Sequence, residues 1–207
     1  MALTMTQASA SEGPPRFSRR HFIKLAAAGV AAAGACTVGG GAYALFLEPN
    51  WAALERVEVR LRGLPERLDG FTITQLSDLH RGPQVSEEQV SEAVALTLQQ
   101  QPDLVALTGD FVSGSAGYAM SCAEALHPLI DHTQVFACLG NHDHWTDAQA
   151  VDEALTGTGV TVLRNSCREV ADGLWIAAVD DIWEQHNDLD RALEGIPDGA
   201  ATVLLAH

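Results

Sequence analysis

The sequence predicts an α/β protein in which helices cover a mixed sheet. Segments with a strand pattern alternate with segments with a helix pattern, which is typical of βαβ units. Asp172 and Gly173 separate two strand-like segments and indicate a hairpin, so part of the sheet is antiparallel. Four further apolar runs end beside polar residues, and they are Phe71–Leu76, Leu104–Thr108, Val135–Leu139 and Thr202–Ala206.

The first elements follow from local signals. Val57–Leu61 and Phe71–Leu76 have strand composition and are joined by a loop with Gly and Pro, so we expect them to pair antiparallel at an edge. Ser86 with Gln89 three residues later is typical of a capping box, and Pro102 ends the helix that begins there.

The second half alternates in the same way. The expected elements are a helix over Ala116–Leu126 that breaks near Pro128, a helix over Asp147–Leu155, strands over Val160–Leu163, Arg168–Val170 and Leu174–Val179, and a short helix over Asp188–Leu193. Strands that alternate with helices along a chain align in parallel, and their carboxyl ends meet at one edge of the sheet. The polar residues after the four apolar runs are therefore expected to form one site.

Charge separates the chain into two parts. Of its 12 basic and 27 acidic residues, four basic and one acidic residue lie in the first 47, which leaves a net charge of −18 for the other 160. A body of that charge repels nucleic acid and anionic lipid, so we expect no nucleic-acid binding.

The N-terminus has the pattern of an export signal. Ser18-Arg19-Arg20-His21-Phe22-Ile23-Lys24 precedes an uncharged run, Leu25–Leu47, and together they resemble a twin-arginine signal. We expect residues 1–47 to engage the twin-arginine translocation machinery, and residues 48–207 to form one catalytic domain on the extracytoplasmic side, in the periplasm or at the membrane face. Cleavage after Ala44, retention as a membrane anchor, and an ordinary anchor or Sec signal all remain open.

The cysteines indicate no metal cluster. Cys36 lies in the export segment, and Cys122, Cys138 and Cys167 lack Cys-x-x-Cys spacing. Cys138 is expected to be a small buried side chain. A disulfide between Cys122 and Cys167 is permitted outside the cytoplasm.

The residues at the strand ends suit a metal centre. Asp78 and His80 follow the first run, Asp110 the second, Asn141 the third and His207 the fourth. One carboxylate can bridge two ions about 3.5 to 4 Å apart, and Asp110 is the candidate. Mixed Asp, Asn and His ligation fits two divalent ions such as Mn, Fe or Zn.

The residues after Asn141 supply candidate acid chemistry. His142 is next to an expected ligand, so its imidazole is free to face the substrate and to protonate a leaving group. Asp143 is expected to orient that imidazole. His144 is expected to be a solvated loop residue, and Asp180 and Asp181 are expected to be turn residues or to support the site.

The ordered motifs Asp78-Leu79-His80, Gly109-Asp110, Gly140-Asn141-His142-Asp143 and His207 resemble those of the calcineurin-like metallophosphoesterases. The resemblance spans residues 71 to 207 and implies an αββα sandwich of two mixed sheets with a dinuclear centre. It implies that Asp78, His80 and Asp110 hold one ion and that Asp110, Asn141 and His207 hold the other. His142 would be the catalytic acid. The export signal, Glu48–Trp51 and Leu76–His80 are similar to the exported, membrane-associated branch.

The expected activity is hydrolysis of a phosphodiester or phosphomonoester, and some relatives of this branch cleave the pyrophosphate of UDP-diacylglucosamine. The family continues after its His to a Gly-His-x-His motif that these 207 residues do not contain. We therefore expect either an incomplete fragment or a short product at the membrane that binds metal without turnover. Gln185-His186-Asn187 or Trp145 could contact a leaving group.

Overall fold

The computed structural model describes residues 18–46 and 53–207, and it divides the chain into two units, Met1–Ala53 and Leu54–His207. In the first unit, α1 (Arg19–Phe46) is a single helix that begins at the paired arginines. Its segment Arg19–Ala42 is long and apolar enough to cross a membrane, a property that N-terminal signal sequences share. Glu48–Trp51 and the expected boundary after residue 47 lie outside the described residues.

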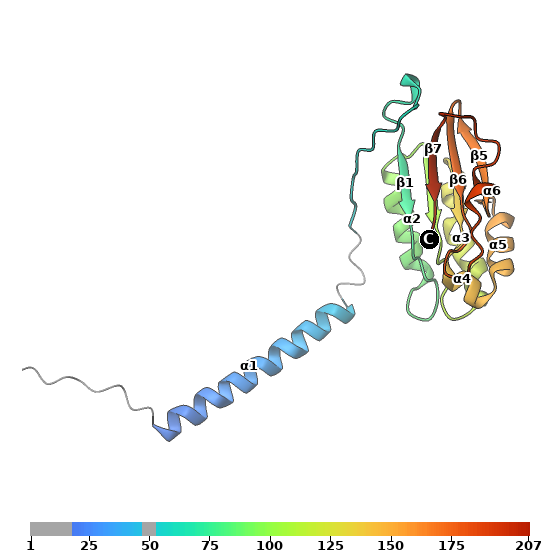
Figure 1. Ribbon diagram of the computed structural model, residues 1–207. Coiled ribbons are helices and arrows are strands. Elements are labelled where there is room, and N and C mark those ends of the chain that lie inside the picture. The colour runs from blue at the N-terminus through green and yellow to red at the C-terminus, as the bar shows by residue number, and fades with distance from the viewer. Residues whose placement is uncertain (1–17, 47–52) are drawn as a thin grey trace, which may run out of the picture. The chain divides into compact units, whose positions relative to one another are not determined.

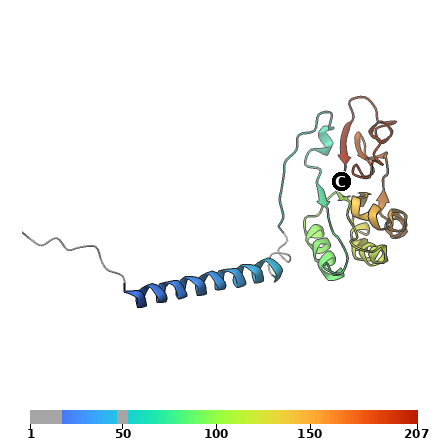
Figure 2. The same cartoon turned by 60° about the horizontal axis from the view of Figure 1, so that its bottom comes forward.

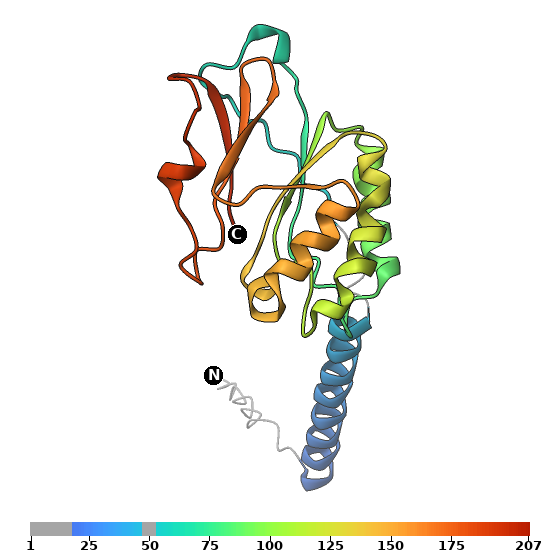
Figure 3. The same ribbon diagram turned by 90° about the vertical axis from the view of Figure 1, so that its right-hand side faces the viewer.

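The second unit is built on a sheet of four parallel strands in the order β1-β2-β3-β4. The strands are β1 (Ile73–Leu76), β2 (Leu104–Thr108), β3 (Gln134–Cys138) and β4 (Thr161–Val162). Three helices, α2 (Glu87–Gln99), α3 (Ala119–Ile130) and α5 (Ala148–Gly157), cover one face of this sheet (Figures 1 and 3).

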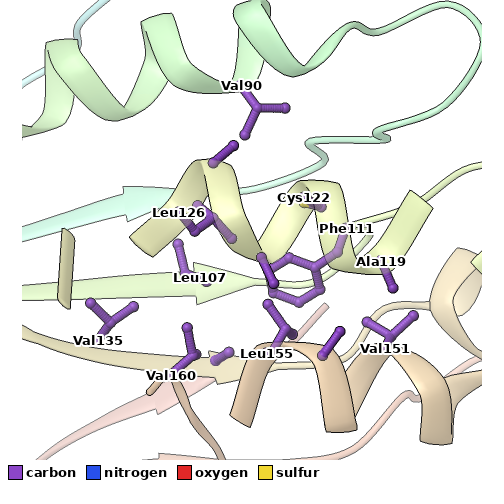
Figure 4. Packing of buried hydrophobic residues seen from close by; sticks show 14 of the residues in the cluster. Val90, Leu107, Phe111, Ala119, Cys122, Leu126, Val135, Val151, Leu155 and Val160 are labelled. Carbon is purple, nitrogen blue, oxygen red and sulfur yellow. The ribbon is translucent and has the colours of Figure 1, made fainter. Parts of the chain in front are cut away.

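Alternating side chains of the central strands point to opposite faces, as strand geometry requires. Leu107 of β2 and Val135 of β3 pack against the helices, where they meet Leu126 of α3 and Leu155 of α5 (Figure 4). Leu104 of β2, by contrast, belongs to a second apolar cluster on the other face. Burial on both faces explains why these strands read as continuous apolar runs.

A second sheet of three strands packs on that other face (Figure 3). Its strands are β5 (Ser166–Ala171), β6 (Leu174–Ala178) and β7 (Ala201–Leu205). β5 and β6 form the antiparallel hairpin expected at Asp172-Gly173, and β7 runs parallel to β6. A short helix, α6 (Leu189–Ala192), precedes β7. Two sheets flanked by helices confirm the predicted fold class.

The helix ends follow the sequence signals at one place and differ at another. At the start of α2, the Gln89 amide donates to Ser86 Oγ and the Ser86 amide donates to Gln89 Oε1, so the capping box is confirmed. The predicted break near Pro128 is wrong, because α3 continues to Ile130. Pro128 lies on the exposed face, where the Glu124 carbonyl that loses its amide donor can bond to water.

The predicted edge strand Val57–Leu61 is also wrong. These residues are not in a strand, and the valines at 57 and 59 are 73% and 66% exposed. Strand composition alone does not make a strand, because the backbone needs a neighbour to bond to, and this stretch pairs with no strand in the described part of the chain.

Three short elements complete the unit. The 3-10 turns Glu66–Leu68 and Ala116–Tyr118 precede β1 and α3, and α4 (Asn141–Thr146) follows β3 directly. The carboxyl ends of β1, β2, β3 and β7 converge at one edge, and the C-terminal residue lies beside the first sheet (Figure 2). The sequence predicted a loop at Asn141–Thr146, whereas the structure has the short helix α4.

Candidate metal centre

The chain segments that leave β1 and β2 run side by side. The amide of Asp78 donates to the Gly109 carbonyl at 3.1 Å, and the amide of His80 donates to the Asp110 carbonyl at 2.8 Å. The backbone therefore brings the first two sequence motifs together, although about 30 residues separate them.

Three of the predicted ligands adopt left-handed backbone conformations. The φ angles are 56° at Asp78, 46° at His80 and 59° at Asp110. This conformation is uncommon for residues other than glycine and costs on the order of 1 kcal/mol or more at each position. The surrounding hydrogen bonds hold it, and strain of this kind concentrates at functional sites.

Two glycines let the ends of β2 and β3 approach closely. A Cβ atom at Gly109 would lie 2.6 Å from the amide nitrogen of Gly140, and one at Gly140 would lie 2.6 Å from the amide nitrogen of Asp110. Neither position has room for a side chain. The close approach lets the His142 amide donate to Oδ1 of Asp110 at 2.9 Å, so α4 is bonded to the bridging candidate.

Asp110 lies at the centre of the site. Its side chain is 3% exposed, and its Oδ2 is 3.4 Å from Nε2 of His80 and 3.3 Å from Nε2 of His207. Two sets of three side chains have ligand atoms within 4.8 Å of one another, and both sets include Asp110. One adds His80 and His142, and the other adds Asp78 and His207.

His207 is held in the orientation that a metal ligand needs. Its Nδ1 is 2.7 Å from the Thr108 carbonyl, which can only accept, so Nδ1 carries a proton and Nε2 faces Asp110. Burial lowers the pKa of His207, but the Thr108 carbonyl and the carboxylates of Asp110, Asp78 and Asp181 raise it more. The surroundings thus favour a positive charge at this point, and the donor set fits a divalent cation.

Asp143 has a different contact from the one predicted. The structure does not show its carboxylate orienting the His142 ring, because both oxygens accept backbone amides. Oδ2 accepts from Asp110 and Gly140, both at 2.9 Å, and Oδ1 accepts from Phe111 at 2.8 Å and Val112 at 3.2 Å. Asp143 therefore fixes the backbone between the ends of β2 and β3.

This carboxyl is fully buried. Burial raises the pKa of Asp143 to about 6, against the bonded amides, which lower it, while the neighbouring Asp110 adds to the rise. The imidazole of His142 contacts two other rings instead. The centroid of His80 is 4.6 Å away, nearly edge-on, and that of Trp145 is 4.7 Å away.

A second polar group contacts α4, and no sequence motif indicates it. His144, expected to be solvated, has a side chain only 7% exposed, and its Nε2 is 2.8 Å from Oδ1 of Asp180. The other oxygen of Asp180 accepts from Nε of Arg164 at 2.7 Å. Burial raises the pKa of Asp180, but the bonds from Arg164 and His144 lower it more, so the net shift is downward. The solvated reading of His144 is therefore wrong.

The loop after β6 lies against the same helix. Asp181 is fully buried, and its backbone carbonyl accepts from the amide of His186. The ring of His186 stacks on His144 with centroids 4.8 Å apart. Two of the residues predicted to contact a leaving group lie in different places. His186 packs on His144, while Trp145 lies beside His142.

The comparison with known families decides the identity of the domain. A family model described as calcineurin-like phosphoesterase matches residues 71–204. The chain belongs to this family. It is accordingly a metallophosphoesterase, an enzyme class that uses divalent metal ions to hydrolyse phosphate esters, and the matched range contains the motifs at the ends of β1, β2 and β3.

Several relatives share this domain. The chain is 33% identical to the uncharacterized metallophosphoesterase YkuE of Bacillus subtilis, over 93% of this chain and 70% of YkuE. It is 34% identical to phosphodiesterase YaeI of Escherichia coli, over 74% of this chain and 56% of YaeI. It is 28% identical to UDP-2,3-diacylglucosamine pyrophosphatase LpxG of Chlamydia muridarum, over 72% of this chain and 46% of LpxG.

Proposed function

We propose that this metallophosphoesterase hydrolyses phosphodiesters at a two-metal site in which Asp110 bridges the ions. The observation that supports this most directly is the membership of one buried carboxylate in two separate sets of ligand atoms. The similarity to YaeI, a protein named as a phosphodiesterase, supports the choice of a diester.

The ligand sets follow from the motif order. Asp78 and His80 serve one ion, Asn141 and His207 serve the other, and Asp110 serves both. These sets differ from the two geometric groups of ligand atoms, which join His80 to His142 and Asp78 to His207 through Asp110, so only the double membership of Asp110 is taken from the geometry. Ions bound there would supply Lewis-acid activation of the phosphate and of the attacking water. Asn141 is the first residue of α4 and follows Gly140, so it is proposed to approach the ions from the end of β3.

His142 donates a proton to the leaving group. In the proposed reaction the water oxygen forms a bond to phosphorus while the bond to the ester oxygen breaks. The leaving oxygen takes that electron pair and receives a proton from the protonated imidazole, while the attacking water releases one proton to solvent, so an alcohol and a phosphomonoester result. The ring contact between His142 and His80 supports this role, because a bound ester would lie beside the proposed metal ligands.

The site can be tested by measuring metal content and turnover on the same protein samples. Asp110→Asn should lose bound metal and abolish hydrolysis of bis(4-nitrophenyl) phosphate. His142→Ala should keep its metal and lose about 10²- to 10⁴-fold in kcat on methyl phenyl phosphate, the usual range for a general acid, because phenoxide needs a proton more than the stable 4-nitrophenolate does. His132→Ala is the matched control, because that imidazole is exposed just after α3 and bonds the Pro128 carbonyl, away from the carboxyl ends of the strands.

Each other outcome identifies a different fault. Loss of metal in His142→Ala would make His142 a ligand and remove its role as the acid. Full activity in Asp110→Asn would refute the bridging role. Metal-loaded wild-type protein without turnover on any phosphate ester would favour a metal-binding module instead of an enzyme.

Residues 1–47 are proposed to direct export by the twin-arginine route, which places the domain outside the cytoplasm. The paired arginines at the start of α1 and the apolar helix that follows support this. Replacing Arg19 and Arg20 by lysine keeps the charge and should retain the protein in the cytoplasm. Arg16→Lys is the control, and unchanged export of the double variant would refute the route.

A further inference from the structure

Trp145 presents a large aromatic surface beside the imidazole of His142. Both residues lie on α4, three positions apart, so their side chains share one face of the helix. The ring centroids are 4.7 Å apart and the planes are inclined by 44°. A group attached to an atom within hydrogen-bond reach of His142 therefore lies next to the indole.

The indole is held in place although it is exposed. Its N–H donates to Oε1 of Glu184 at 2.8 Å, and its ring contacts His142. Trp145 is nevertheless 57% exposed. A side chain that is already immobilised loses little conformational entropy when a ligand packs on it, so this surface is prepared for binding.

We propose that Trp145 selects the leaving group, favouring phosphodiesters whose leaving group is planar, apolar and uncharged. The proposal rests on the proposed hydrolysis, because it places the leaving group between His142 and the indole. The planar preference follows from the ring, since flat groups stack well on tryptophan.

The preference for an uncharged group follows from the carboxylate of Glu184. It accepts the indole N–H and repels an anionic leaving group at the same place. The high negative charge of the domain acts in the same direction. The site should therefore favour a diester with a neutral aromatic alcohol over a pyrophosphate, in which the leaving group is itself an anionic phosphate.

Two substrates that differ mainly in aromatic area test the proposal. Methyl 2-naphthyl phosphate and methyl phenyl phosphate release alcohols of similar acidity, so a difference in kcat/KM reports packing of the leaving group. Wild-type protein should prefer the naphthyl ester about two- to tenfold, the range expected for one aromatic stack. Trp145→Ala should bring the ratio close to one, and Trp145→Phe should restore part of it.

Trp183→Ala is the matched control, because that indole is more exposed, at 76%, and lies on the loop after β6. It should leave the preference unchanged. An unchanged preference in Trp145→Ala, or a preference lost only in Trp183→Ala, would overturn the proposal.

Binding separates this proposal from the proposed reaction. The fluorescence of 2-naphthylmethylphosphonate, which has no ester bond, reports its affinity without turnover. Weaker binding by Trp145→Ala together with no hydrolysis by the wild type would sustain the indole site and refute the reaction. Hydrolysis with the same naphthyl preference, and the same phosphonate affinity, in both proteins would sustain the reaction and refute the indole site.

Discussion

Replacing Asp143 by asparagine removes one acceptor from a buried carboxylate that bonds four backbone amides. The amide oxygen can still accept from Phe111 and Val112, but the new NH₂ group then faces the amides of Asp110 and Gly140. Each buried donor left without an acceptor costs about 1–3 kcal/mol, so the free energy of unfolding should fall by about 2–6 kcal/mol. That is a large part of the stability of a typical domain.

Urea denaturation of the full chain in detergent, with tryptophan fluorescence as the signal, measures this loss of unfolding free energy. Asp147→Asn is the matched control: Asp147 is an exposed N-cap whose Oδ1 accepts from Ala150 at 3.1 Å. Asparagine caps a helix about as well as aspartate, so this variant should change stability by less than about 0.5 kcal/mol. Equal losses in the two variants would show that the four amides do not depend on the Asp143 carboxylate.

Three further outcomes follow from the structure. Asp180→Asn should destabilise the protein by about 1–3 kcal/mol near neutral pH. The pKa of Asp180 is lowered in the folded state, so this stabilisation is present above the ordinary value of 3.8 and is lost as the pH falls through the folded pKa. The unfolding curves of wild type and Asp180→Asn should therefore converge in acid. A difference that stayed constant with pH would contradict the assignment. Burial raises the pKa of the Cys122 and Cys138 thiols to about 12, so native protein should react with iodoacetamide at Cys36 and Cys167 alone, and mass spectrometry of the labelled peptides detects any exception. Gly109→Ala should abolish metal binding, measured by elemental analysis, because φ is +88° and the added Cβ would press on Gly140, whereas Gly114→Ala, with φ of +78° and open space around it, should bind metal normally.

Elements defined by local chemistry could be predicted from the sequence. The strand Leu104–Thr108 matches the prediction residue for residue, because it is buried on both faces and therefore has no polar interruption. The predicted capping box at Ser86 and hairpin at Asp172-Gly173 are confirmed because each depends only on residues next to one another in the sequence. The strand predicted at Val57–Leu61 was wrong because a strand needs a partner strand, and the residues of the segment do not specify one.

The site divides in the same way. Three of the side chains expected at the strand ends, those of Asp78, His80 and His207, have ligand atoms close to those of Asp110, since each follows a strand whose carboxyl end reaches the same edge. The pairing of His144 with Asp180 spans 36 residues and two sheets, and no spacing rule connects them. A partial signal was present, because Asp180 follows the apolar run Leu174–Val179 as Asp110 follows its own strand, and the sequence therefore predicted Asp180 either in a turn or in support of the site.

The two kinds of contact at the site have different consequences for experiment. Glycine packing and the four amides on Asp143 set the positions of the strand ends, and these are backbone interactions. The side chains of Asp78, His80 and His207 are partly exposed, at 55%, 29% and 15%, and contribute less to the core. Changes to these predicted ligands should therefore remove metal while the fold persists, whereas changes to Asp143 should lower the free energy of unfolding of the domain. A ligand variant that lost metal but kept the unfolding curve of metal-free wild type would show that the backbone, and not the ion, builds the site.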